Sequence, residues 1–283
     1  MGQTQRPQVS QRLALTPSAS IVVPLLREPL KWLEQCVHSA LAQSAASDVL
    51  VVVSPLTPDA LRVALRRWSV HSPRLAVLVE ERPGFASALN TGIGASRTKR
   101  VGFLLADDWL ERGAVEACLA HDADIVSTGL RVWAEDGRRE FASLQRRPTQ
   151  VRYDALATVE LRAAYLEHFF LFRREALLAV GGVDETIGST GADDFDLIWT
   201  LLEHDASVTV ISDLLYNYRD HYGERLTLRS PELQHRDLAR ILDKHGVSGP
   251  VRERMLSEHA VWFGAPVHVI EQRLRRAKEA ASI

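Results

Sequence analysis

Residues 20–53 read SIVVPLLREPLKWLEQCVHSALAQSAASDVLVVV, a helical pattern between two apolar, β-branched runs. The runs at 20–25 and 49–53 are expected to be strands, and their near-continuous apolar character indicates burial on both faces of a sheet. Between them, residues 28–44 carry apolar side chains at steps of three and four, which places these side chains on one face of a helix. Strand, helix and strand in this order predict parallel strands joined by right-handed crossovers.

The same alternation continues downstream and predicts an α/β fold with a mostly parallel sheet flanked by helices. An Arg-containing stretch at 134–149 is expected to be an exposed loop, and a helical pattern follows at 153–166. The further expected strands are residues 75–79, 101–105, 124–128 and 208–211, and the further expected helices of this part are residues 59–68 and 86–97.

Three segments are expected along the chain. Residues 1–18 are rich in Gln, Ser, Thr and Pro, and we predict a flexible tail because they bury little apolar surface. Residues 19–230 are predicted to form the α/β domain. Residues 231–283 are predicted to be a helical C-terminal appendage, with helical patterns at 233–245, 250–263 and 266–281.

The composition excludes several classes of protein. The chain has 283 residues, 46% of them hydrophobic and 25% charged, which argues against a disordered or fibrous protein. A formal net charge of -2 provides no summed positive field for a phosphate backbone, so we expect no nucleic-acid partner. The apolar runs are much shorter than the ~20 residues that span a bilayer, and Cys36 and Cys118 lie among apolar neighbours, as core thiols do. We therefore expect a cytoplasmic protein without membrane contact.

Two adjacent carboxylates, Asp107 and Asp108, follow the expected strand at 101–105. Ligands gather beyond the carboxyl ends of strands in open parallel sheets. Carboxylate oxygens hold hard divalent cations, which neutralise a diphosphate, so this pair is a candidate site for Mn²⁺ or Mg²⁺. The structural alternative is an Asp that caps a helix starting near Gly113, or a solvated turn.

A second acidic group, Asp193, Asp194 and Asp196, follows a glycine-rich turn at 188–191 and begins a helical pattern. A carboxylate is favourable at a helix N-terminus, which gives a structural interpretation for one of the three. Three acids within four residues repel one another unless one is hydrogen-bonded, protonated or close to a cation, and these conditions also tune a general base. Asp194, or failing it Asp193, is the candidate base.

Residues 216–222 read YNYRDHY and are expected just beyond the last strand. His221 is a candidate metal ligand through its neutral imidazole, and Arg219 is a candidate for binding a phosphate in a forked geometry. Arg82, before a Pro-Gly turn, is a second candidate for the phosphate. The alternative for each residue is a side chain that binds no ligand.

Taken in order, these segments resemble the inverting family 2 glycosyltransferases, which have the GT-A fold. The likeness covers residues 20–225. Any one motif is weak evidence for this family, whereas six motifs in the same order are strong evidence. The six motifs are residues 20–24, 84–95, 103–108, 172–185, 192–197 and 218–221.

The resemblance implies transfer of a sugar from a nucleotide-sugar donor to a hydroxyl acceptor, with inversion and with a divalent cation, Mn²⁺ or Mg²⁺, as cofactor. It implies metal ligands at Asp107, with Asp108 as its neighbour, and at His221, and a general base at Asp194 or Asp193. It also implies a donor half at 19–122 and an acceptor half at 123–230. The donor-binding residues expected on this basis are Pro24, Ser54, Arg82, Asn90, Asp107 and Arg219.

The chain departs from the family pattern on the donor side. After the second strand the family shows two Asp and a Gly that hold the base and ribose, whereas residues 54–58 read SPLTP. Leu105 stands where the full acidic motif has a further acid. These departures motivate a second hypothesis, a noncatalytic GT-A-like binding or scaffold protein with an eroded donor site. A nucleotidyltransferase is a third hypothesis, but the chain lacks a Gly- and Lys-rich loop near the first strand.

The last helical pattern has an apolar side and a basic group. Val267 and Ile270 lie on the apolar side, and Arg273 and Arg275 belong to the basic group. This pattern suits a second copy of the chain, a membrane surface or the chain's own core as the docking partner, so a homo-oligomer stays open.

Overall fold

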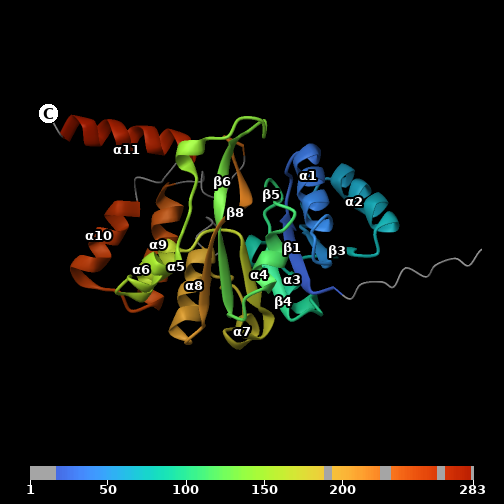
Figure 1. Cartoon of the computed structure of the whole chain (residues 1–283), viewed down its shortest axis with the longest axis horizontal. Helices are drawn as coiled ribbons and strands as arrows, with labels where there is room; N and C mark the ends of the chain where they lie inside the picture. Colours follow the sequence, from blue (N-terminus) through green and yellow to red (C-terminus); the bar gives the residue numbers. More distant parts are fainter. Residues whose placement is uncertain (1–16, 188–192, 224–230, 260–264, 282–283) are drawn as a thin grey trace, which may run out of the picture.

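The computed structural model describes residues 17–187, 193–223, 231–259 and 265–281. Its centre is one eight-stranded sheet in the order β3-β2-β1-β4-β7-β6-β8-β5. Helices cover both faces of this sheet, with α1 and α2 on one side and α8 and α9 on the other (Figure 1). The expected α/β class, with a sheet flanked by helices, is confirmed.

Four parallel strands form the first half of the sheet. β1 pairs with β2 on one side and with β4 on the other, and β2 pairs with β3. Every residue of β1 is buried, because helices cover both faces of the strand, as its near-continuous apolar sequence predicts. The strands are β1 (Ala19–Leu25), β2 (Ser47–Val53), β3 (Leu75–Val79) and β4 (Arg100–Phe103).

The helices that connect these strands lie on both faces. α3 packs so closely on β1 that a Cβ at Gly92 would stand 2.3 Å from Val22 Cγ1, so only glycine allows this approach. α1, α2 and α4 pack against the core on the opposite face, where Cys36 and Cys118 are buried free thiols as expected. The helices are α1 (Leu30–Leu41), α2 (Asp59–His71), α3 (Phe85–Ala95) and α4 (Ala114–Leu119).

The second half of the sheet differs from the sequence-based expectation. β5 (Trp109–Leu110) and β7 (Phe170–Arg173) were not predicted, and β7 runs antiparallel between β4 and β6 (Ile125–Ala134). β8 (Val208–Asp220) continues past residue 211, so the residues from Tyr216 to Asp220 lie inside a strand and not beyond it. The prediction ended too early because this part of β8 is polar, and its polar side chains have partners on neighbouring segments.

A second set of helices covers the other face of β6, β7 and β8. The single helical pattern at 153–166 is two short helices, α5 and α6, and the expected loop at 134–149 contains a short 3₁₀ helix, η1 (Ala142–Leu144). Leu238, Ile241 and Leu242 of α9 join α8 in this core. The helices are α5 (Gln150–Asp154), α6 (Val159–Tyr165), α7 (Arg174–Ala179), α8 (Asp193–Glu203) and α9 (Pro231–Lys244).

Two further helices, α10 (Gly249–His259) and α11 (Val267–Ala281), follow α9, near the patterns expected there. The first turn of α11 is tied to the end of β8, because Asp220 accepts hydrogen bonds from the backbone N–H groups of Val267 (3.0 Å) and His268 (2.9 Å). From there α11 extends away from the sheet (Figure 1). Residues 1–16 of the expected tail, the turn at 188–191 and residues 224–230 lie outside the described residues.

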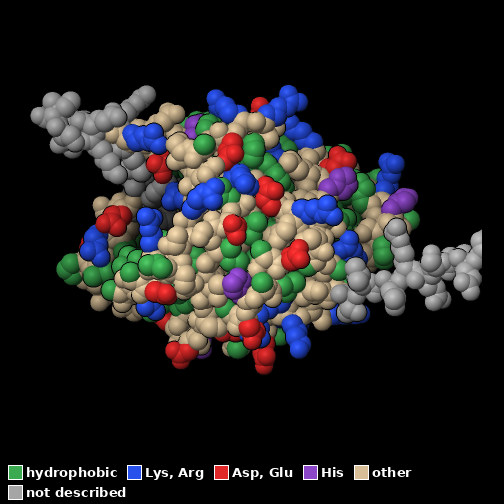
Figure 2. Space-filling view, in the orientation of Figure 1, with side chains coloured by type: hydrophobic (Ala, Val, Ile, Leu, Met, Phe, Trp, Pro, Cys, Tyr) green, Lys and Arg blue, Asp and Glu red, His purple; other side chains and the backbone are tan. Residues whose placement is uncertain are grey.

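The surface gives no sign of one dominant charge on the face that Figure 2 displays, where acidic and basic side chains are interspersed. This agrees with a formal net charge of -2.

In the part of the chain that the structure describes, every helix is too short or too polar to cross a membrane.

Candidate active site

Asp107 and His221 meet at the end of the parallel half of the sheet. Asp107 follows β4, and His221 follows the last residue of β8. His221 Nε2 lies 2.9 Å from Asp107 Oδ2, and the imidazole is almost fully buried against the ring of Trp32. The backbone N–H of Gly223 donates to His221 Nδ1 (3.0 Å), so Nε2 carries the ring hydrogen and donates it to Asp107.

This pair fits part of a divalent cation site. The ligand types suit such an ion, because carboxylate oxygen and neutral imidazole nitrogen both coordinate divalent cations, whereas the 2.9 Å separation is that of a hydrogen bond. A neutral imidazole would bind a cation through Nε2 only with its hydrogen on Nδ1, so cation binding would also end the hydrogen bond from Gly223. Within the described ranges, no cluster of three or more His, Cys, Asp or Glu side chains forms a complete cage. A cation here would therefore need further ligands such as phosphate oxygens or water.

Asp108 faces a different set of partners. Its Oδ2 accepts a hydrogen bond from Tyr216 Oη (2.6 Å) and its Oδ1 accepts one from the backbone N–H of Arg219 (2.6 Å). Asp108 is 1% exposed. Burial, followed by the charge of Asp108, raises the pKa of Tyr216 well above its ordinary value, so the phenol stays a donor. Asp108 therefore fixes β8 next to Asp107, and neither acid caps α4, whose N-terminus at Gly113 has no side-chain cap.

Arg219 is enclosed by the protein rather than exposed to a ligand, with 2% of its surface accessible. Its Nε donates to the backbone oxygen of Asp107 (2.8 Å), and one terminal nitrogen donates to the backbone oxygen of Glu135 (2.8 Å). The other terminal nitrogen donates to Gln35 Oε1 (2.6 Å). The guanidinium lies over the rings of Trp32 and Trp109, 5.0 and 4.9 Å from their centroids. Arg219 thus holds the backbone of Asp107 in place.

Glu28 adds a further carboxyl group to this region. Its Oε2 accepts hydrogen bonds from the backbone N–H groups of Leu26 (3.1 Å) and Arg27 (3.0 Å). Burial, and next the charge of Asp107, raise the pKa of Glu28. A carboxyl whose ionised form is disfavoured by a neighbouring carboxylate would be relieved by a cation between them.

A second cluster lies at the start of α8. Asp194 is half exposed, with 41% of its side chain accessible, and its Oδ2 lies 3.0 Å from His168 Nε2. The backbone N–H of Phe195 donates to Asp194 Oδ1 (2.7 Å). Oδ1 therefore has a hydrogen-bond donor, Oδ2 has a ring nitrogen 3.0 Å away, and both oxygens keep further lone pairs. An exposed, oriented carboxylate of this kind is suited to accept a proton.

Asp193 differs sharply from its neighbour. It is 1% exposed, and neither carboxylate oxygen has a hydrogen-bond partner among the described residues. Burial raises the pKa of Asp193 to about 7, and the charge of Asp194 adds to this rise. Asp193 is thus a poorer candidate for direct contact with an acceptor.

Asp196, the third acid of the motif, is a structural residue. It binds Lys244 Nζ (2.7 Å) and His245 Nε2 (3.1 Å), and His245 stacks on Trp199 with ring centroids 4.3 Å apart. These contacts fasten α8 to the end of α9. The three acids therefore have three different environments, and Asp194 is the one that faces solvent.

The expected donor residues Pro24, within β1, and Ser54, directly after β2, are both buried. Pro24 is buried and pairs with Val52. Ser54 lies in a turn whose polar groups satisfy one another: its backbone N–H donates to Thr57 Oγ1 (3.0 Å), which in turn donates to the oxygen of Leu25 (2.9 Å). This is the turn at which the resemblance leads us to expect two Asp and a Gly.

Arg82 and Asn90 meet at Glu185, in a third group. Arg82 is exposed and forms an ion pair with Glu185 Oε2 (2.7 Å), while Asn90 Nδ2 donates to Glu185 Oε1 (3.0 Å). Asn90 also exchanges two hydrogen bonds with the backbone of Val183. Gly182 before it has a φ of +79°, and a Cβ there would stand 2.3 Å from Asn90 Oδ1. Asn90 thus fastens this glycine turn to α3.

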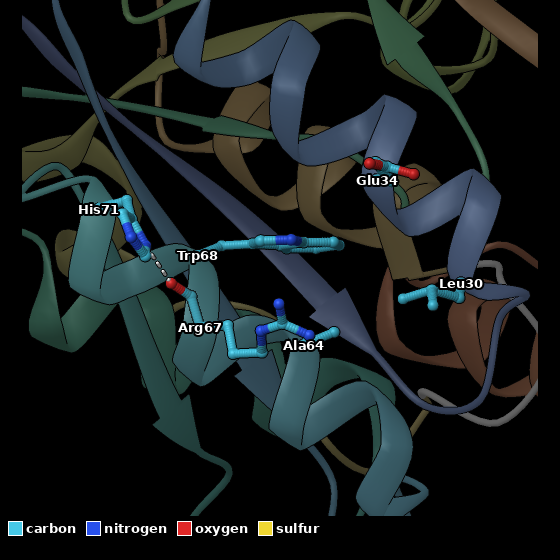
Figure 3. A pocket seen from close by; sticks show the side chains of 6 residues that line it. All are labelled: Leu30, Glu34, Ala64, Arg67, Trp68 and His71. Atoms are coloured by element: carbon cyan, nitrogen blue, oxygen red, sulfur yellow. Dashed lines mark hydrogen bonds between the residues drawn. The ribbon is translucent and has the colours of Figure 1, made fainter.

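The cavity in Figure 3 is separate from both acidic clusters. It lies between α1 and α2 and is lined by Leu30, Glu34, Ala64, Arg67, Trp68 and His71. None of the site residues predicted from the sequence contributes to this lining.

Several residues of the two clusters were not predicted. Trp32 and Gln35 are three positions apart, so they share one side of α1 and reach Arg219 together. Trp109 immediately follows the acidic pair, a signal that could have been used. His168 had no local signal, because it is a single histidine before an apolar run and meets Asp194 only through the fold.

The family described as Glycosyl transferase family 2 matches residues 20–181, which is more than half of the chain. The chain therefore belongs to glycosyl transferase family 2. It is 27% identical over 219 residues to the uncharacterized glycosyltransferase EpsJ of Bacillus subtilis (strain 168), covering 73% of this chain and 62% of EpsJ. It is 32% identical over 212 residues to the O-antigen biosynthesis protein RfbC of Myxococcus xanthus, covering 74% of this chain but 16% of RfbC. The chain thus spans less than two thirds of either relative.

Solved structures share the fold. S. aureus TarS in complex with UDP-GlcNAc superposes with a TM-score of 0.61 at 17% identity, covering 87% of this chain and 72% of that chain. The mannosyltransferase PcManGT from Pyrobaculum calidifontis, in complex with GDP-Man and Mn²⁺, superposes with a TM-score of 0.59 at 20% identity, covering 87% of this chain and 70% of that chain. These likenesses confirm the GT-A-like fold.

Proposed function

We propose that the chain transfers a sugar from a nucleotide-diphosphate sugar to a hydroxyl acceptor in a single inverting displacement. The observation that carries the proposal is the presence of two separate acidic clusters with opposite characters, in a member of glycosyl transferase family 2. One cluster, Asp107 with His221, suits a cation. The other, Asp194, is an exposed carboxylate. In the proposal residues 19–122 bind the donor and residues 123–230 bind the acceptor.

Asp107 and His221 would hold a divalent cation, Mn²⁺ or Mg²⁺. When bound, the cation offsets the negative charge that grows on the departing nucleoside diphosphate. Arg219 supports this cluster by fixing the backbone of Asp107, and Asp108 supports it by fixing β8. TarS and PcManGT are both seen with nucleotide-sugar donors, and PcManGT also with Mn²⁺, which supports a donor and a cation of these classes.

Asp194 would act on the opposite face of the sugar. The acceptor oxygen forms a bond to the anomeric carbon while the bond from that carbon to the diphosphate oxygen breaks, so the configuration inverts. The acceptor proton passes to a carboxylate oxygen of Asp194. The exposure of Asp194 allows an acceptor to approach, whereas the burial of Asp193 does not.

The closed turn after β2 favours a second candidate function. Because Ser54 and Thr57 satisfy each other and the end of β1, this turn offers a nucleotide fewer free polar groups than the family pattern does. A noncatalytic binding or scaffold protein that keeps the fold would show this erosion. The two candidates differ in whether a nucleotide binds in a cation-dependent way.

Titration calorimetry with UDP, GDP and dTDP, with and without Mn²⁺ or Mg²⁺, distinguishes them. We expect one nucleotide to bind more tightly with the cation, and we expect Asp107→Ala to remove the cation dependence. Asp136→Ala, an exposed acid in the turn after β6, is the matched control and should bind like the parent. The catalytic proposal fails if none of the three nucleotides binds, and the metal assignment fails if Asp107→Ala keeps the full cation dependence.

A further inference from the structure

A column of side chains connects the two acidic clusters across the sheet. Tyr216 Oη donates to Asp108 Oδ2 (2.6 Å), and the ring of Tyr216 stacks on the imidazole of His168, with centroids 5.4 Å apart and planes 28° apart. His168 Nε2 then lies 3.0 Å from Asp194 Oδ2. Asp194 is therefore linked to Asp108, the acid beside Asp107, by contacts through the rings of His168 and Tyr216.

His168 is held from both sides along the backbone. Ser127 Oγ on β6 accepts a hydrogen bond from the N–H of Glu167 (3.0 Å) and donates one to its oxygen (2.6 Å). Thr128 Oγ1 accepts the N–H of Phe169 (2.9 Å). The imidazole also packs against Phe170, with centroids 4.8 Å apart. A ring fixed in this way offers a donor at a fixed place to a carboxylate that is otherwise half exposed.

The surroundings of the two ring nitrogens of His168 assign its role. Nε2 faces the carboxylate of Asp194, whereas Nδ1 is buried and has no hydrogen-bond partner among the described residues. A hydrogen on Nδ1 would be a buried donor without an acceptor, which is costly, so the hydrogen belongs on Nε2. With Nε2 already carrying a hydrogen, the ring cannot take a proton from Asp194 through that atom.

We propose that His168 is a positioning residue for the general base: its Nε2–H holds Asp194 Oδ2, so that the remaining lone pairs of the carboxylate point toward the acceptor. The proposal rests on the proposed function in taking Asp194 as the base. The contact orients the carboxylate, so that a lone pair is aimed at the acceptor hydroxyl. Removing the hydrogen bond should therefore slow the chemical step without weakening donor binding.

The test compares His168→Phe, which keeps an aromatic ring in the column, with His168→Gln, which also supplies a side-chain N–H. The assay is release of UDP from UDP-GlcNAc and of GDP from GDP-mannose, with water as the acceptor. We expect His168→Phe to lower kcat by about 10- to 100-fold, as for loss of a hydrogen bond to a charged group, with KM unchanged. His168→Gln should recover most of kcat. His204→Phe, an exposed histidine in the turn that follows α8, is the control and should match the parent.

Turnover of Asp194→Asn, alone and combined with His168→Phe, distinguishes a failure of this proposal from a failure of the proposed function. If Asp194→Asn keeps the turnover of the parent, the base assignment itself is wrong. If Asp194→Asn is inactive but His168→Phe matches the parent, His168 does not position the base. Likewise, if His168→Phe lowers the residual rate of Asp194→Asn by the same factor, the two residues are independent, which overturns the proposal.

A spectroscopic measurement needs no substrate. In long-range ¹H–¹⁵N spectra, the ring signals of His168 are identified by their loss in His168→Gln. We expect the hydrogen of His168 on Nε2, and we expect its ring ¹⁵N shifts to move in Asp194→Asn. A hydrogen on Nδ1, or ring shifts that do not respond to Asp194→Asn, would overturn the proposal.

Discussion

The cluster around Asp107 and the cluster around Asp194 are built in opposite ways. In the first, Asp108 and Arg219 are almost fully buried, and each uses several hydrogen bonds within the protein. In the second, Asp194 is half exposed, and neither oxygen of Asp193 has a hydrogen-bond partner among the described residues. In the first cluster, the side chains of Asp108 and Arg219 are engaged by partners within the protein. In the second cluster, the buried carboxylate of Asp193 lies next to the half-exposed carboxylate of Asp194.

This difference follows from what each cluster would do. A cation and a diphosphate carry concentrated charge, and fixed ligands stabilise them without reorganisation during the reaction. A base has to meet a variable acceptor hydroxyl and release a proton afterwards, so access to solvent is useful there. Stability and turnover should therefore depend on different clusters, and substitutions test this division.

The largest expected effect is on turnover, at Asp194. Asp194→Asn keeps the shape of the side chain and removes its basicity, so turnover should fall by about 10²- to 10⁴-fold, the contribution of a general base. Binding of UDP or GDP with Mn²⁺, measured by calorimetry, should stay at the level of the parent. If the same substitution at Asp193 abolishes turnover and Asp194→Asn does not, the roles of the two acids are reversed.

The next effect is on stability, at Arg219. Arg219→Met leaves the oxygens of Gln35, Asp107 and Glu135 without their buried donor. Each buried acceptor without a donor costs about 1–3 kcal/mol, so the free energy of unfolding should fall by about 3–5 kcal/mol. Urea denaturation followed by circular dichroism measures this loss. Arg66→Met, an exposed arginine of α2, is the control and should change stability little. A loss in Arg219→Met as small as the control's would show that the enclosed guanidinium contributes little.

Asp193 should make stability depend on pH. The pKa of Asp193 is about 7 in the folded state against an ordinary value of 3.8. Protonation of Asp193 therefore stabilises the folded state fully below pH 4, and this stabilisation is lost as pH rises through 7. The unfavourable contribution at pH 8 is at most about 4 kcal/mol, from 1.36 kcal/mol per pKa unit. Asp193→Asn should therefore gain stability relative to the parent at pH 8 but not at pH 4, in urea titrations at both pH values. Asp213→Asn, an exposed acid, should show no such dependence, and an equal response of both variants would contradict the assignment.

The smallest expected effect is at Tyr216. Tyr216→Phe removes the donor to Asp108 Oδ2 and keeps the ring against His168, so the free energy of unfolding should fall by about 1–3 kcal/mol. Thermal unfolding monitored by calorimetry measures it. An unchanged melting temperature would indicate that Asp108 finds another donor in the variant.

The strands and helices of the parallel half of the fold could be predicted from the sequence, whereas those of the second half were predicted less well. β1 to β4 are strongly apolar and are separated by helical patterns, so their local sequence agrees with their final state. β8 beyond Ile211 is polar, and its strand conformation depends on β6 and β5, which are distant in sequence. β7 is four residues long and follows a loop, which leaves little periodicity to detect.

The candidate site shows the same limit. Adjacent acids after a strand were visible in the sequence at Asp107 and Asp108, although Asp108 turned out to bind Tyr216 and the backbone of Arg219. Burial decides the difference between Asp193 and Asp194, and burial is a property of the packed helices. The metal ligands, the base and the donor contacts stay predictions until the binding and turnover experiments are done.

The contacts of Asp107 and Asp108 with the end of β8 have a consequence for the order in which the molecule assembles. Asp107 and His221 are 114 positions apart, and Asp108 and Tyr216 are 108 apart. At a synthesis rate of about 5–20 residues per second, about 6–23 s pass on the ribosome between Asp107 and His221. During this interval β1 to β4 and their helices are already made, while Asp107 and Asp108 have no partners from β8. A nascent chain that stops before β8 therefore has the parallel half of the sheet without the cluster around Asp107.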